Sequence, residues 1–162
     1  MSKVQTELMS SAVMTFEDMG FVFAMPELEE AHHTAPFEGA AEVDFSGPFN
    51  GRLIISLYGQ MMGELAANMM GEDEPPPVQQ QHDALGEIAN VICGNVLPKV
   101  GGSREIFYIG APRYIEQAGG LGQQSDDESS VKVSVPLDDG RADVMLFVKN
   151  WSIEDDPCVG GR

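Results

Sequence analysis

Basic residues are scarce in this chain, and their scarcity excludes several classes of function. The 162 residues include only nine Lys and Arg against 26 Asp and Glu, which gives a formal charge of −17. Binding to nucleic-acid phosphates or to an anionic membrane surface needs clustered Lys and Arg. The composition therefore predicts no nucleic-acid partner and no membrane partner, and it leaves small molecules or proteins with a basic patch.

Cysteines and long apolar runs are scarce as well. Cys93, in an apolar helical pattern, and Cys158, in a polar tail, could form at most one bridge and resemble no metal-ligand cluster. No segment approaches 18 consecutive apolar residues, and the N-terminal stretch has no long apolar run after its single Lys. We therefore expect free thiols in a reducing compartment and a soluble, cytoplasmic protein.

The residues that are present are typical of one globular domain. Hydrophobic residues make up 43% of the chain and charged residues 22%, which suits a normal core at this length. We place a single domain at residues 1–152 and expect a flexible tail at residues 153–162.

Hydrophobic periodicity predicts helices followed by hairpins. The helices are expected at residues 6–20, within 59–73, and from 82 until Pro98 and the Gly101-Gly102 pair end the last one. Alternating runs around turn residues predict hairpins at residues 42–58 and 130–150, with a further strand region at 105–116. Residues 26–40 and 117–130 are expected to be loops.

The order of these elements contains a weak internal repeat. Each half has a buried helix and then a hairpin whose second strand begins with Gly-Arg, at residues 51–52 and again at 140–141. The first helix carries "EDMG" at residues 17–20 where the later helix carries "EIAN" at residues 87–90. The pattern predicts an α+β fold: a two-layer, pseudo-duplicated unit with an antiparallel sheet and helices packed on one face.

One of the predicted helices carries a row of polar residues. In "HDALGEIANVICGNVLP" (residues 82–98), the spacing of Asp83, Glu87 and Asn90 places them on one helix face together with Gly94. The apolar residues form a row roughly opposite: Leu85, Ile88, Ile92 and Val96. An amphipathic helix needs polar residues on its outer face in any case, so an ordinary solvated surface remains the alternative.

Small residues flank this polar row. Gly86 and Gly94 each cost about 1 kcal/mol of helix stability relative to Ala. Such a cost makes sense where another surface must approach the helix closely.

The segment "DALGEIANVICGN" resembles the signature helix of the CheX/CheC/FliY chemotaxis phosphatases. In that signature an acidic or Ser residue, three spacers, Glu, two spacers and Asn are followed by a Gly-Asn pair. The matching positions here are Asp83, Glu87, Asn90, Gly94 and Asn95. The resemblance extends over most of residues 5–150, and the order of elements is most similar to CheX.

This resemblance implies an enzyme that hydrolyses the aspartyl phosphate of a CheY-type response regulator. Asn90 would hold the attacking water and Glu87 would bind a Lys of the regulator. Asp83 would assist docking or else favour the N-terminal end of the helix, and Gly86 and Gly94 would assist docking. No cofactor on this chain is implied, because the phosphorylated partner would supply the bound Mg²⁺. CheX relatives form dimers by joining sheets, so a homodimer through sheet edges is implied too.

The resemblance also bears on the number of sites. Some CheC relatives have two active helices, whereas the first helix here offers Glu17 but has Gly20 where Asn would stand. We therefore predict one working site. The alternative is a non-catalytic binding module of the same fold, similar to flagellar switch proteins, that docks a regulator without hydrolysing anything.

Other candidate residues have simpler interpretations. The pair His32-His33 lies among acidic residues, but adjacent histidines in a Pro-containing segment lack metal-site geometry, so we expect a solvated loop. His82 is expected at the surface, and Cys93 is expected to act as a small core hydrophobe. The methionines of residues 61–70 are expected in the core, with a protein contact surface as the alternative.

Overall fold

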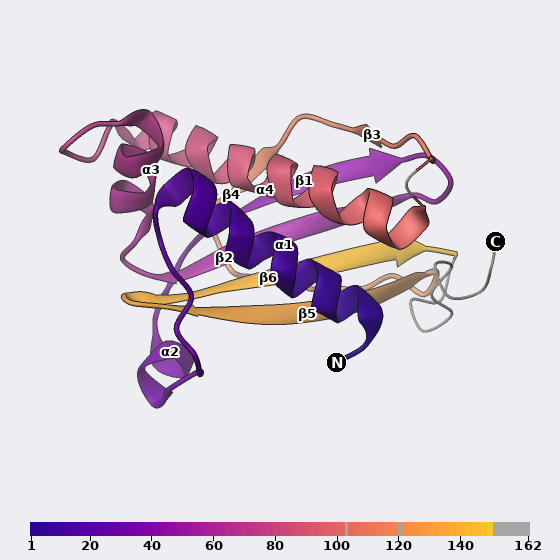
Figure 1. Cartoon of the computed structure of the whole chain (residues 1–162), viewed down its shortest axis with the longest axis horizontal. Helices are drawn as coiled ribbons and strands as arrows, with labels where there is room; N and C mark the ends of the chain where they lie inside the picture. The colour runs from indigo at the N-terminus through magenta and orange to yellow at the C-terminus, as the bar shows by residue number, and fades with distance from the viewer. Residues whose placement is uncertain (103, 120, 151–162) are drawn as a thin grey trace.

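One antiparallel sheet carries two long helices on one of its faces. The computed structural model describes residues 1–102, 104–119 and 121–150. Helices α1 (Lys3–Gly20) and α4 (Val78–Gly101) lie side by side across the sheet (Figure 1). The predicted two-layer α+β fold is confirmed.

The two predicted hairpins form the body of the sheet. Strands β1 (Phe37–Ser46) and β2 (Gly51–Gly59) make the first, and β5 (Glu128–Leu137) and β6 (Gly140–Lys149) make the second. With the short strand β3 (Tyr108–Ile109) at one edge, the strand order is β3-β1-β2-β6-β5. Strands β2 and β6 therefore pair at the centre and join the two halves.

The central strand pair shows that the Gly-Arg repeat is structural. The Arg52 guanidinium carbon lies 4.1 Å from the centre of the Phe147 ring, directly across from it on β6. At the other end of the strand pair, the Arg141 guanidinium carbon lies 3.9 Å from the centre of the ring of Tyr58, its own cross-strand neighbour. Each arginine therefore covers an aromatic ring of the other half, as a duplicated unit would require.

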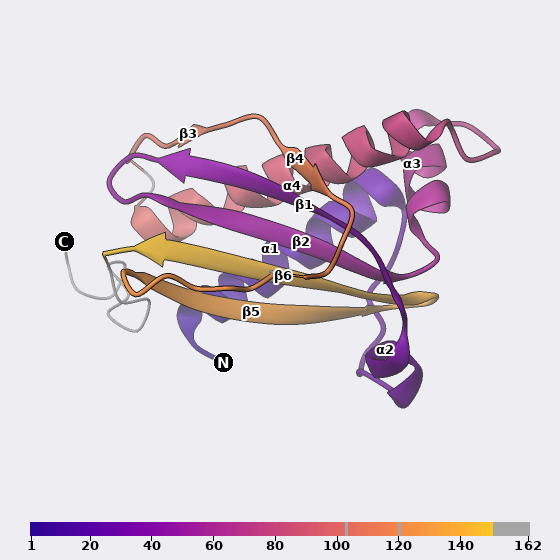
Figure 2. The same ribbon diagram turned by 180° about the vertical axis from the view of Figure 1, so that it is seen from behind.

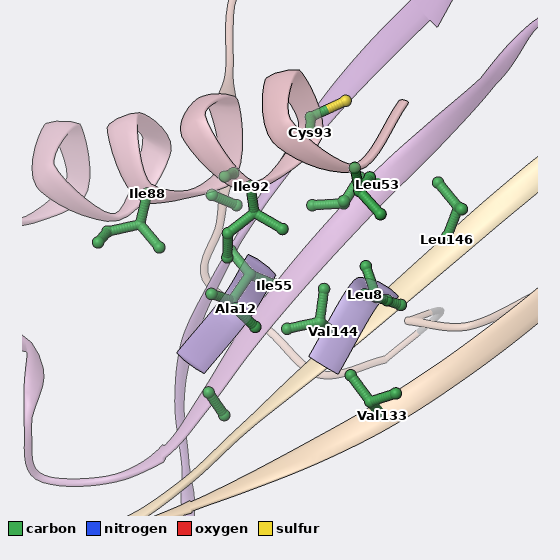
Figure 3. Close-up of a cluster of buried hydrophobic side chains, with 14 of the residues drawn as sticks. Leu8, Ala12, Leu53, Ile55, Ile88, Ile92, Cys93, Val133, Val144 and Leu146 are labelled. Atoms are coloured by element: carbon green, nitrogen blue, oxygen red, sulfur yellow. The ribbon is translucent and has the colours of Figure 1, made fainter. Parts of the chain in front are cut away.

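Apolar side chains from both helices meet the inner face of the sheet. Leu8 of α1, Ile88 of α4 and Ile55 of β2 are all fully buried. Figure 3 shows these side chains pointing into one cluster. Burial of this apolar surface is the main favourable term that holds α1 and α4 in place.

Helix α1 begins three residues earlier than the periodicity predicted. The Ser2 side chain accepts from the Gln5 backbone N–H, and the Gln5 side chain accepts from the Ser2 backbone N–H in return. This reciprocal cap satisfies two donors at the helix start. The short predicted helix is α3 (Met62–Met70), which packs against both α1 and α4.

The expected loop at residues 26–40 is wrong in part. It contains a short helix, α2 (Glu30–Thr34), and β1 begins within it at Phe37. His32 is buried rather than solvated: its Nδ1 accepts from the Glu29 N–H at 2.7 Å, and its Nε2 lies 2.9 Å from the carbonyl oxygen of Leu137. That contact spans more than a hundred residues, and local periodicity carries no trace of it.

The predicted strand region and polar loop in the middle of the chain complete the sheet. Strands β3 (Tyr108–Ile109) and β4 (Arg113–Ile115) both pair with β1. The following segment crosses the second face of the sheet (Figure 2). There Leu121 packs against the small cluster of Ala40, Ile54 and Phe147, and the carbonyl oxygen of Gln123 accepts from Arg52. These contacts correct the expectation of a free loop.

Part of the chain lies outside this description. The expected tail at residues 153–162, with Cys158, belongs to it. Of the helices in the described ranges, none combines the length and the apolar character that a membrane crossing requires.

Candidate functional site

Helix α4 presents the polar row to solvent because its other side is held in the core. Leu85, Ile88 and Ile92 have no exposed surface and pack on the sheet. The helix runs through Pro98 and ends at Gly101, with Gly102 as its cap, so the predicted stop at the Gly101-Gly102 pair is confirmed and a stop at Pro98 is not. Pro98 removes one backbone hydrogen bond close to the end of α4. The turns before Pro98 are already packed on the sheet, so the helix continues to Gly101.

The structure brings the predicted site residues together on the outer face of α4. Asp83 and Glu87 are exposed and Asn90 is half-buried, so all three are accessible in the chain. The side-chain nitrogen of Gln79 donates to Asp83 Oδ1 at 3.0 Å. The carboxylate of Glu87 and the carboxamide of Asn90 therefore lie one turn apart on a single accessible row.

The carboxamide of Asn90 is not held by hydrogen bonds. Its Oδ1 is buried and has no hydrogen-bond partner among the residues that the structure describes. A buried acceptor in this state costs about 1–3 kcal/mol. Since no hydrogen bond fixes the group, a half-turn about its last torsion can exchange the carbonyl and the NH₂ at little cost. The oxygen can therefore meet a ligand only after this rotation turns it outward.

A proline from the β3–β4 connection forms the wall beside this row. Pro112 lines a shallow hollow together with Asp83, Glu87, Asn90 and Val91. Sequence reasoning missed Pro112, because the proline lies 22 positions after Asn90 and only strand pairing brings it back to α4. Any partner that reaches Asn90 must fit against this proline.

The two glycines that flank the polar row of α4 differ in what approaches them. Gly86 is buried, and a Cβ at this position would lie 2.9 Å from the Cβ and Cγ of Pro112. The surface that approaches Gly86 closely is therefore this chain's own loop and not a partner, which removes the basis for its docking role. Gly94 is exposed, and a Cβ at this position would meet only Ile109 Cδ1, at 3.8 Å, which is an ordinary contact. Its docking role stays a prediction.

The equivalent position in α1 has no room for an asparagine. A Cβ on Gly20 would lie 2.3 Å from Leu65 Cδ1, and Leu65 is itself buried. The carbonyl oxygen of Gly20 accepts from the side chain of Asn68 at 2.8 Å. Close packing of α3 on α1 thus occupies the place where a second carboxamide would stand.

The remaining candidates do not gather into a second site. Among the described residues, no three His, Cys, Asp or Glu side chains are placed to hold a metal ion together. Burial raises the pKa of the Cys93 thiol to about 12, so it stays protonated and acts as the small core hydrophobe that was predicted. The ring of His82 is half-buried and stacks on Tyr114, with centroids 3.4 Å apart. This stack holds β4 against the start of the candidate site.

The fold and the exposed Glu-Asn row define a class, that of two-layer α+β proteins with a long polar-faced helix on an antiparallel sheet. Comparison with protein families gives the particular one. Residues 40–136 match the family described as chemotaxis phosphatase CheX, and the chain belongs to that family. No curated protein is significantly similar to it in sequence.

Solved structures share the fold over nearly the whole chain. CheX from Vibrio vulnificus has a TM-score of 0.72 at 16% identity and covers 91% of this chain and 97% of its own. CheX from Desulfovibrio desulfuricans has a TM-score of 0.73 at 16% identity, with coverages of 91% and 100%. The CheX of a CheX–CheY–BeF₃–Mg²⁺ complex from Borrelia burgdorferi has a TM-score of 0.65 at 18% identity, with coverages of 89% and 96%. At these identities the likeness is one of fold.

Proposed function

We propose that this chain is a phosphatase that hydrolyses the aspartyl phosphate of a CheY-type response regulator in chemotaxis or related signalling. The observation that carries the proposal is the accessible row on α4, where Glu87 is exposed and the carboxamide of Asn90 has no hydrogen bond to the described residues. Membership of the CheX family supports it. The proposed partner also implies action in the cytoplasm.

Asn90 would act on the attacking water. A carboxamide accepts through its oxygen and donates through its nitrogen, so it can hold a water in line with phosphorus. The water oxygen then bonds to phosphorus while the bond from phosphorus to the regulator's aspartate oxygen breaks. The aspartate leaves as a carboxylate, and both protons of the water stay with the product as H₂PO₄⁻ unless one is released to solvent to give HPO₄²⁻. Because an acyl phosphate is already activated, orienting the water removes much of the remaining barrier.

Glu87 would orient the docked pair. Its carboxylate lies one turn before Asn90 and is exposed, so a Lys of the regulator can reach it in a charge-assisted contact. Asp83, one turn further back, adds a second carboxylate to the same row. Mg²⁺ bound in the regulator would neutralise charge on the phosphoryl oxygens, and this chain would supply no metal ligand.

The test is the decay of a radiolabelled, phosphorylated CheY-type regulator with catalytic amounts of this protein. We expect faster loss of label, and we expect Asn90→Ala to lower the acceleration by about 100-fold or more, since orientation of the water is lost. Asn50→Ala removes an exposed asparagine in the β1–β2 turn, outside the signature helix, and should act like the unmodified chain. An unchanged decay rate with Asn90→Ala would disprove the role of Asn90.

Replacement of Glu87 tests docking separately. Glu87→Ala should weaken binding of the regulator by about tenfold and lower turnover at subsaturating regulator, because a charged contact is lost. Glu64→Ala removes an exposed carboxylate on α3 and serves as the matched control. If binding is unaffected by Glu87→Ala, the assigned role is wrong.

The second candidate is a binding module that holds a regulator without hydrolysis, as the fold alone would permit. Binding of the regulator with unchanged decay of the phosphate would support it. The homodimer that the resemblance implies stays a prediction. Strand β5 ends the sheet, and its outer edge has no strand partner among the described residues.

A further inference from the structure

A groove of about 520 Å³ lies beside the candidate site. It is bounded by the C-terminal end of α1, by α3 and by the first half of α4, which meet at one end of the molecule (Figure 1). Asp83 and Glu87 line this groove and also line the hollow around Asn90. The two carboxylates therefore form a ridge between the groove and the hollow. A partner that contacts Glu87 is already at the edge of the groove.

Large apolar side chains are exposed at this groove, and their exposure does not stabilise the fold. Phe21 is 65% exposed and Met70 is 43% exposed, and both line the groove. Phe21 follows α1 in a left-handed conformation with φ 52° and ψ 35°. Gly or Asn is favoured at such a position, because other residues cost about 1–2 kcal/mol there. With most of its ring exposed, this strained phenylalanine gains little compensating burial from the part of the chain that the structure describes.

The charge of the groove has one sign. Asp18 joins Asp83 and Glu87 in its lining, and no Lys or Arg is among the described residues that line it. The exposed apolar side chains and the acidic side chains of this groove together suit a partner segment that has an apolar side chain next to a basic one.

We propose that this groove receives a second segment of the response regulator, one that presents an apolar side chain beside a Lys or Arg, while Asn90 reaches the phosphorylated aspartate. Phe21 and Met70 are then docking residues that determine affinity and choice of regulator. The proposal rests on the proposed function, because it takes the same partner at the same site. It also gives the exposed end of the methionine row a use as a contact surface.

Two phenylalanines of nearly equal exposure make a matched test. Phe21 lines the groove, whereas Phe23, at 62% exposure, does not. Phe21→Asn removes the aromatic ring and installs a residue that tolerates the left-handed conformation, so folding is preserved. Phe23→Asn makes the same chemical change outside the groove. Met70→Gln tests the opposite wall with a polar side chain of similar length.

In the experiment, each response regulator of the source organism is phosphorylated in turn. The regulator whose dephosphorylation this protein accelerates then serves as the probe. We expect Phe21→Asn to raise KM for that phosphorylated regulator by about tenfold with kcat within about twofold, because the groove contributes binding away from the reacting atoms. Met70→Gln should raise KM in the same way by about threefold. Phe23→Asn should leave both constants unchanged. Equal KM values for Phe21→Asn and Phe23→Asn would overturn the proposal.

The two proposals can fail separately. If the unmodified chain accelerates decay but Phe21→Asn behaves like Phe23→Asn, only the groove is wrong. If no regulator decays faster, the phosphatase proposal fails, and Kd for the beryllofluoride-activated regulators replaces KM. Weaker binding by Phe21→Asn alone then still supports the groove, and absence of any binding overturns both.

Discussion

At Asn90 the chain keeps a polar side chain whose oxygen is buried and unpartnered among the described residues. Other buried polar groups are held, as where Asp143 contacts both Arg141 and Ser134. The buried hydroxyls of Ser11 and Ser56 also lack a hydrogen-bond partner among the described residues, but neither lies in the exposed polar row of α4. A group left without partners is available for a ligand, and its cost to folding is offset by the core beneath it. Stability and the proposed activity therefore make opposite demands on this residue.

Asn90→Ala should leave the free energy of unfolding unchanged or raise it by up to about 1 kcal/mol. The substitution removes an unsatisfied acceptor and places a better helix former in α4. Urea unfolding followed by circular dichroism measures the change, with Asn95→Ala as the control for helix propensity alone. A loss of stability greater than about 1 kcal/mol would show that Asn90 makes a structural contribution, and our interpretation of its free carboxamide would be wrong.

Helix α4 is the element that connects the core to the candidate site. Its apolar face fixes it on the sheet, and its polar face carries Glu87 and Asn90. The docking roles of Gly86 and Gly94 were both predicted from one argument, that a partner surface approaches the helix closely. The structure separates them, because Pro112 covers Gly86 and leaves Gly94 open.

The same substitution at the two glycines should have opposite effects. Gly86→Ala should lower the free energy of unfolding by about 1–3 kcal/mol, since its Cβ would overlap Pro112 and displace the β3–β4 connection. Gly94→Ala should raise it by about 1 kcal/mol through helix propensity. Thermal unfolding of both variants checks the signs, and stabilisation by both would show that Pro112 yields easily. Weaker regulator binding by Gly94→Ala would support its docking role.

Across the whole molecule, the two halves of the repeat have kept the sheet and diverged at the helices. The stacked pairs of Arg52 with Phe147 and Arg141 with Tyr58 repeat at both ends of the central strands. On the helical side the two halves differ at the position of Asn90, where α1 has Gly20. Gly20 of α1 is packed under Leu65 instead.

Restoring asparagine in the first half should not create a second site. We expect Gly20→Asn to lower the free energy of unfolding by about 1–3 kcal/mol, because the side chain would overlap Leu65 in a packed region. Calorimetric titration with an activated regulator should give one binding site per chain both before and after the change. Two sites per chain would contradict a single functional helix.

Local patterns determined most of the elements. The hairpins, the long helices and the Glu87–Asn90 row all follow from periodicity and turn residues, which act over a few positions and so can be predicted from the sequence. The motif around Asn90 likewise predicted the family before any fold was known. Boundaries were less accurate, as at Ser2 and Pro98, because capping and tertiary packing decide where a helix starts and stops.

Contacts between distant segments were decided only by the tertiary structure. Pro112 over Gly86, the buried His32 against Leu137 and the groove under Phe21 each join residues that no local pattern connects. Their energies depend on the strand pairing that brings them together. The sequence by itself therefore determined which side chains carry the proposed chemistry, and only the folded chain decided which surfaces remain open for a partner.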